Sequence, residues 1–67
     1  MPTVLVVDDA PQIRDLYLEI LESRGYNVIT AEDGEEGLAK IKAELDKPLK
    51  HRTTIDAIIT DYRMPGL

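Results

Sequence analysis

Cysteine, phenylalanine and tryptophan are absent from these 67 residues, and three tyrosines are the only aromatic side chains. Without cysteine the chain forms neither a disulfide nor a thiolate zinc site, a usage that suits a reducing compartment, so we expect a cytoplasmic protein. No apolar run approaches the roughly 20 residues of a membrane span, and the N-terminus shows no basic-then-apolar signal pattern. We therefore expect no membrane contact and an aliphatic core.

Positive charge is also scarce, because 13 acidic residues face only 8 lysines and arginines and leave a net charge of −5. Nucleic-acid binding relies on neutralising phosphates, so this acidic chain is predicted to have no direct nucleic-acid partner. The length allows one domain at most. A chain of this size buries only about 60% of its unfolded surface, so its stability is marginal. The apolar fraction of 43% nevertheless argues against disorder.

Three short β-favouring runs predict strands, and two amphipathic stretches between them predict helices. Strands are expected at residues 3–9, 26–31 and 55–61, helices at 11–25 and 32–47, and a polar loop at 48–54. Pro11 suits the first turn of the first helix, and Gly25 suits its end. In the second helix Leu38, Ile41 and Leu45 share one face, which we expect to pack on the sheet.

This βαβαβ order predicts an α/β fold with a parallel sheet and right-handed crossover helices. The first strand contains the continuous apolar run Val4 to Val7, which is typical of a strand covered on both faces. We therefore place it in the centre, giving the strand order 2-1-3 with one helix on each face.

Carboxylates follow two of the predicted strands. Asp8 and Asp9 end the first strand and Asp61 ends the third, so they are expected to meet at the sheet edge where open α/β folds bind ligands. Three negative charges at one place repel one another unless a cation joins them, and hard oxygen ligands suit Mg²⁺. Taken singly, the Asp-Asp pair is often a helix N-cap and a strand-terminal Asp is often a turn former. Their combination favours a site.

Three segments, VLVVDD, AEDGEEGL and DAIITDYRMPG, resemble the receiver domain of two-component response regulators, which has a flavodoxin-like fold. The resemblance implies that Asp61 is the phosphoacceptor and that Asp8 and Asp9 hold Mg²⁺, with Asp61 and the backbone carbonyl of Arg63 as further ligands. It also implies a sensor histidine kinase or phosphotransfer protein as phosphodonor. By this resemblance the protein is a signalling module and not an enzyme.

The chain departs from the family in length, since a whole receiver has about five strands. The Ser/Thr and Lys of the later strands cannot be placed here. Residues 1–67 are therefore expected to form a truncated receiver domain, its first three strands and two helices, with impaired phosphotransfer. The apolar edge of the third strand would then invite pairing with another chain, which predicts a homo-oligomer.

Two other functions remain open. A Mg²⁺-dependent phosphohydrolase with an Asp nucleophile typically has Asp-x-Asp after its first strand, and the adjacent Asp8 and Asp9 disfavour it. The other is a structural or dimerisation fragment without phosphotransfer, which labelling of Asp61 by a phosphodonor would distinguish. Arg14 could offset the acids, but solvated surface pairing is the usual role of such a residue. His51 lies in a basic loop that we expect to face water.

Overall fold

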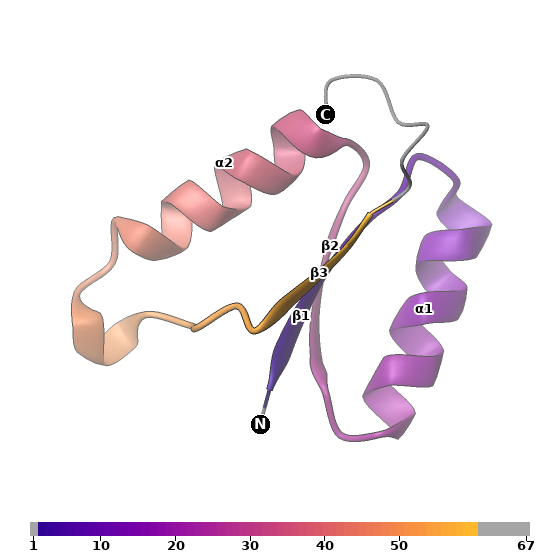
Figure 1. Ribbon diagram of the computed structural model, residues 1–67, viewed down its shortest axis with the longest axis horizontal. Helices are drawn as coiled ribbons and strands as arrows, with labels where there is room; N and C mark the ends of the chain where they lie inside the picture. The colour runs from indigo at the N-terminus through magenta and orange to yellow at the C-terminus, as the bar shows by residue number, and fades with distance from the viewer. Residues whose placement is uncertain (1, 61–67) are drawn as a thin grey trace.

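The computed structural model describes residues 2–60 and confirms the predicted order of elements. The elements are β1 (Thr3–Val7), α1 (Pro11–Ser23), β2 (Asn27–Ala31), α2 (Gly34–Leu45), the 3₁₀ turn η1 (Leu49–His51) and β3 (Ala57–Thr60), as Figure 1 shows. The turn η1 lies in the segment expected to be an irregular loop. Within residues 2–60 neither α1 nor α2 combines the length and the apolar character needed to cross a bilayer.

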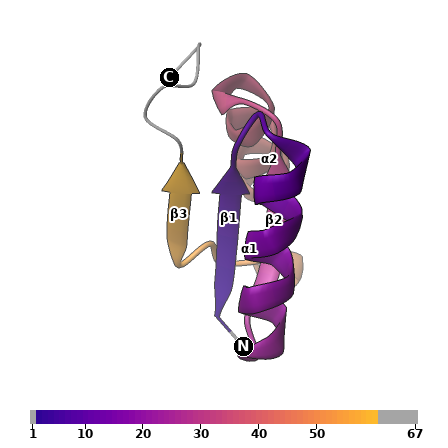
Figure 2. The same ribbon diagram turned by 90° about the vertical axis from the view of Figure 1, so that its right-hand side faces the viewer.

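The sheet is parallel, with the predicted order β2-β1-β3. Both crossover helices lie where this order requires, α1 on one face and α2 on the other (Figure 1). Viewed from the side of α1, β3 stands at one edge of the sheet and β1 in the centre (Figure 2). All five residues of β1 are buried, in agreement with a strand that has a neighbour on each side and a helix on each face.

The core is small and aliphatic. Leu5, Val7 and Ala31 form its buried cluster on the α2 side, with Ile29 and Ile41 packed against them. Val6 alternates to the other face and is 0% exposed. Because the central strand contributes most of the buried side chains, its Val-Leu-Val-Val run is the main source of hydrophobic stabilisation.

Helix α1 begins and ends at the predicted signals. Pro11 is its first residue, where the missing N–H has no helical partner to lose. Beyond the last turn Gly25 has a φ of 89°, and the N–H groups of Gly25 and Tyr26 donate to the carbonyls of Glu22 and Leu21. This is a Schellman motif, which reverses the chain into β2.

Helix α2 turns the predicted side toward the sheet, but two of the three predicted residues contribute little to its packing. Leu38 is 65% exposed and Leu45 57% exposed, so of the three predicted residues only Ile41 packs against the core. Gly34 and Gly37 are buried instead. A Cβ at Gly37 would lie 3.2 Å from Cγ2 of Val7, which shows that the helix approaches β1 through the space that the missing side chain leaves.

Candidate functional site

The carboxyl ends of the strands meet at one edge, as predicted. Val7 and Thr60 are register partners, so the described parts of β1 and β3 end level with each other. The N–H of Asp8 donates to the carbonyl of Ala31 at 3.1 Å, which ties the residue after β1 to the end of β2. Asp8 and Asp9 therefore lie at this edge. Asp61 and Arg63 lie outside the described residues.

Asp8 is buried and structurally engaged. Its side chain and backbone together are only 8% exposed, and its Oδ1 accepts the N–H of Ala10 at 2.9 Å. This bond closes an Asx turn between β1 and α1. The N-cap of α1 is Ala10, which makes no side-chain capping bond, so the alternative interpretation of Asp8 and Asp9 as N-cap residues is wrong.

Asp9 differs from its neighbour because it is exposed to solvent in the bend that follows β1. The two adjacent carboxylates therefore have different environments, one anchored by a backbone N–H and one facing water. Among residues 2–60 no group of three His, Cys, Asp or Glu side chains is close enough to hold a metal ion. The third carboxylate of the predicted set, Asp61, lies outside these residues.

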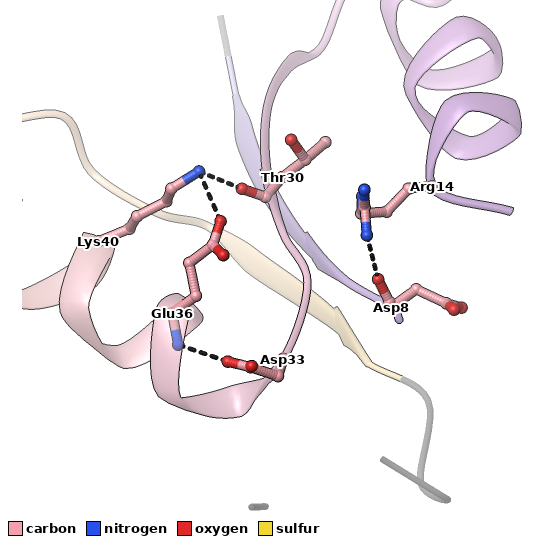
Figure 3. Close-up of polar contacts among 6 residues, drawn as sticks. All are labelled: Asp8, Arg14, Thr30, Asp33, Glu36 and Lys40. Atoms are coloured by element: carbon pink, nitrogen blue, oxygen red, sulfur yellow. Dashed lines mark hydrogen bonds and ion pairs between the residues drawn. The ribbon is translucent and has the colours of Figure 1, made fainter. Parts of the chain in front are cut away.

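Arg14 contacts the acidic segment in an unexpected way. Its Nη1 donates to the backbone carbonyl of Asp8 at 2.8 Å, as Figure 3 shows, and within residues 2–60 it forms no ion pair with a carboxylate. The sequence considered alone suggested only a charge-offsetting role. The signal that points to this contact is the position of Arg14 in the first turn of α1, just after the Asp-Asp bend, where a long side chain reaches back toward the strand end.

A second polar cluster fixes the start of α2 (Figure 3). Asp33 is the N-cap of this helix, and its Oδ1 accepts the N–H of Glu36 at 2.7 Å. Lys40 lies 3.3 Å from Oε1 of Glu36 and also donates to the carbonyl of Thr30 in β2. These contacts assign the AEDGEEGL segment a structural role, because they join α2 to the edge strand.

The basic loop after α2 is also tied to the helix. Glu44 forms an ion pair with Lys47 at 2.7 Å and accepts the N–H of Thr53 at 2.8 Å. The Lys47 ammonium and then the Thr53 N–H lower the pKa of Glu44 below its ordinary value. Arg52 donates to the carbonyl of Leu45 at 2.7 Å, which satisfies an end carbonyl of α2. His51 is exposed, as expected.

Comparison with known proteins identifies the family and the fold. Residues 4–67 match the model of the response regulator receiver domain family. The alkaline phosphatase synthesis transcriptional regulatory protein PhoP of Bacillus subtilis is 47% identical over 64 residues, covering 96% of this chain and 23% of PhoP. The transcriptional regulatory protein AruR of Pseudomonas aeruginosa is 37% identical over 68 residues, covering 98% of this chain and 25% of AruR.

A solved structure agrees with these sequence relatives. The crystal structure of a response regulator receiver domain protein from Clostridium thermocellum superimposes with a TM-score of 0.82 and 33% identity, covering 100% of this chain and 48% of that one. The chain thus spans about a quarter of the length of PhoP and AruR. It belongs to the response regulator receiver domain family, whose members are phosphoaccepting signalling modules of two-component systems.

Proposed function

We propose that Asp61 is the phosphoacceptor and that Asp8, Asp9, Asp61 and the backbone carbonyl of Arg63 hold Mg²⁺. The observation that carries the proposal is the pairing of Val7 with Thr60. Asp8 and Asp61 are the next residues in sequence after these two partners. Since neighbouring parallel strands end at the same edge, this register supports a shared site.

The described donors fit a magnesium ion. Mg²⁺ is bound by one or two carboxylates and keeps several of its waters. The exposed carboxylate of Asp9 is accessible to such a hydrated ion. Asp8 uses Oδ1 for the N–H of Ala10, so Oδ2 is the oxygen that we assign to the metal side. When bound, the ion neutralises charge on the transferring phosphoryl group.

The transfer that we propose takes phosphate from a phosphohistidine of a sensor histidine kinase or phosphotransfer protein. A carboxylate oxygen of Asp61 attacks phosphorus and forms an O–P bond. The N–P bond breaks, and the imidazole leaves with the electron pair and takes up a proton. A carboxylate is a weak nucleophile, so the reaction depends on positioning and on charge neutralisation. The product is an aspartyl phosphate.

We further propose that residues 1–67 constitute the first three strands and two helices of a receiver. The solved relative is about twice as long, which supports this extent. Within these 67 residues we assign no counterpart of the family's later Ser/Thr and Lys. A 67-residue chain tested by itself is therefore expected to be labelled less efficiently than a complete receiver.

The proposal is tested by incubating the chain with a small phosphodonor and Mg²⁺ and measuring its intact mass. The wild type is expected to gain one phosphoryl group, and Asp61→Asn to gain none. Asp56→Asn is the matched control, because Asp56 lies near the opposite end of β3, where its Oδ2 accepts the N–H of Thr3 at 2.8 Å. Asp56→Asn should be labelled like the wild type. Labelling that persists in Asp61→Asn would contradict the assignment.

A second candidate function, dimerisation, is favoured by the exposure of β3. Within the described sheet β3 is an edge strand, outside the area that α1 covers (Figure 2). Its Ile58 is 53% exposed. Two copies could pair β3 with β3 about a two-fold axis, antiparallel, and form a six-stranded sheet.

Light scattering with size-exclusion chromatography tests this pairing. The wild-type chain is expected to run as a dimer and Ile58→Lys as a monomer, because a charged side chain at the pairing edge opposes association. Leu49→Lys is the control, since Leu49 is 79% exposed on η1, away from the strand. A monomeric wild type would eliminate the dimer.

A further inference from the structure

We propose that Arg14 is a positioning residue, whose guanidinium fixes the peptide between Asp8 and Asp9 and so orients the acidic pair toward a cation. This inference rests on the proposed function of that pair. Arg14 is not one of the proposed metal ligands, and it acts on them through the backbone.

The contact that carries the inference is the bond from Nη1 of Arg14 to the carbonyl oxygen of Asp8, at 2.8 Å and partly buried. Asp8 is held at two further points. Its N–H donates to the carbonyl of Ala31 at 3.1 Å, and its Oδ1 accepts the N–H of Ala10 at 2.9 Å. The Asx turn already restrains the peptide between Asp8 and Asp9, because that peptide lies within the ring that the Oδ1 bond closes. Arg14 adds a third hold on Asp8, at the carbonyl oxygen of the same peptide.

That carbonyl belongs to the same planar peptide unit as the N–H of Asp9. Because a peptide is rigid, fixing its oxygen also fixes the direction in which the chain enters Asp9. Asp9 is exposed, so packing constrains its side chain little. The bond from Arg14 therefore acts together with the Asx turn to set the position from which the Asp9 side chain starts, before any cation arrives.

Electrostatics and positioning predict opposite effects of removing Arg14. A positive charge near two carboxylates repels an incoming cation, so its loss by itself strengthens Mg²⁺ binding. Loss of the bond to the carbonyl leaves the Asp8–Asp9 peptide restrained by the Asx turn alone, so Mg²⁺ must order the segment further as it binds, and binding weakens. The sign of the change therefore distinguishes a positioning residue from a charge that only offsets the acids.

The experiment is a Mg²⁺ titration of the 67-residue chain followed by amide NMR, with wild type, Arg14→Met and Arg24→Met. Arg24→Met is the matched control, because it removes the same charge just beyond the other end of α1. Arg14→Met is expected to raise the dissociation constant about three- to tenfold, the factor that corresponds to one net hydrogen bond. Arg24→Met is expected to change it less than about twofold, since exposed distant charges are screened.

A second readout needs no metal. Hydrogen exchange at the Ala10 amide reports on the Asx turn directly, because that N–H donates to Oδ1 of Asp8. Arg14→Met should accelerate exchange at Ala10 while amides of the buried strand β1 keep their rates. A merely structural role would instead accelerate β1 as well. Arg14→Lys keeps the charge and still has a hydrogen-bond donor, on a shorter side chain. Its Mg²⁺ dissociation constant and its Ala10 exchange rate should lie between those of wild type and Arg14→Met.

The outcomes separate the two proposals. If wild type binds Mg²⁺ and Arg14→Met binds it equally or more tightly, the role of Arg14 is overturned and the metal site stands. If amides near Asp8 and Asp9 in the wild type do not respond to millimolar Mg²⁺, the metal site itself is overturned, and the role of Arg14 with it. Should Arg14→Met fail to fold, Arg14→Gln decides, because its side chain is too short to keep the bond to the Asp8 carbonyl. Binding and Ala10 exchange unchanged from wild type in that variant would refute positioning.

Discussion

Asp8 has one observed contact and one proposed role, and substitution can separate them. Its Oδ1 accepts the N–H of Ala10, and we assign its charge to the metal site. Asp8→Ala removes both the acceptor and the charge, whereas Asp8→Asn keeps an acceptor oxygen at the same position and removes only the charge. Asp8→Ala should therefore lose stability and Mg²⁺ binding together, and Asp8→Asn should lose mainly Mg²⁺ binding.

The magnitude follows from the geometry of that bond. A hydrogen bond to a charged acceptor contributes about 1.5–3 kcal/mol, and this one is partly buried. Domains of this length have about 3–10 kcal/mol of total stability at roughly 0.05–0.15 kcal/mol per residue. Asp8→Ala thus removes a large share of the free energy of unfolding. At about 4–8 °C per kcal/mol, the melting temperature should fall by roughly 6–24 °C.

Thermal unfolding followed by circular dichroism measures this loss. Asp8→Asn should stay within about 1 kcal/mol of wild type, since a neutral hydrogen bond replaces a charged one. Asp15→Ala is the control, because Asp15 is exposed on α1, and it should change stability by less than about 0.5 kcal/mol. An Asp8→Ala chain as stable as wild type, or an Asp8→Asn chain as unstable as Asp8→Ala, would refute the reasoning.

Three other outcomes are expected. Gly25→Ala should lower the free energy of unfolding by about 1–2 kcal/mol, and Gly25→Asn should lower it less, because φ is 89° and no atom lies within 4 Å of the added Cβ. Equal losses in the two variants, measured by thermal unfolding, would argue against backbone strain. Gly37→Val should cost about 1–3 kcal/mol by crowding Val7, and a stabilised variant would show that the strand yields. Glu44 has a lowered pKa, so its contribution to stability is complete above the unfolded pKa of about 4.5 and disappears as pH falls through the folded pKa. Lys47→Met should raise the pKa of Glu44, as measured by NMR titration. An unchanged pKa would contradict the ion pair.

The fold was predictable because its signals are local. The run Val4 to Val7 identified the central strand, and Pro11 and Gly25 marked the limits of α1. The contacts of α2 were only partly predictable from hydrophobicity, because Ile41 packs on the core as predicted but two glycines pack beside it and Leu38 is left exposed. A glycine contributes to packing because it has no side chain and lets the helix approach the sheet closely. A search for apolar side chains at helical spacing therefore does not detect it.

The candidate site was predictable in part. The convergence of strand ends follows from the parallel topology, and it placed Asp8 and Asp9 at one edge. The difference between their environments depends on an Asx turn and on the contact of Arg14 with a backbone carbonyl. Both contacts end on backbone groups, which every residue has. Residue types alone therefore predicted neither the Asx turn nor the contact of Arg14. The roles of Asp61 and Arg63 stay predictions.

The most direct test of the central claim is to locate the phosphoryl group. After treatment with a small phosphodonor and Mg²⁺, borohydride reduction converts an aspartyl phosphate to homoserine, which peptide sequencing by mass spectrometry can place. Homoserine at position 61, dependent on both phosphodonor and Mg²⁺, is the predicted result. Homoserine only at another aspartate, such as Asp9 or Asp56, would contradict the assignment of Asp61 as phosphoacceptor.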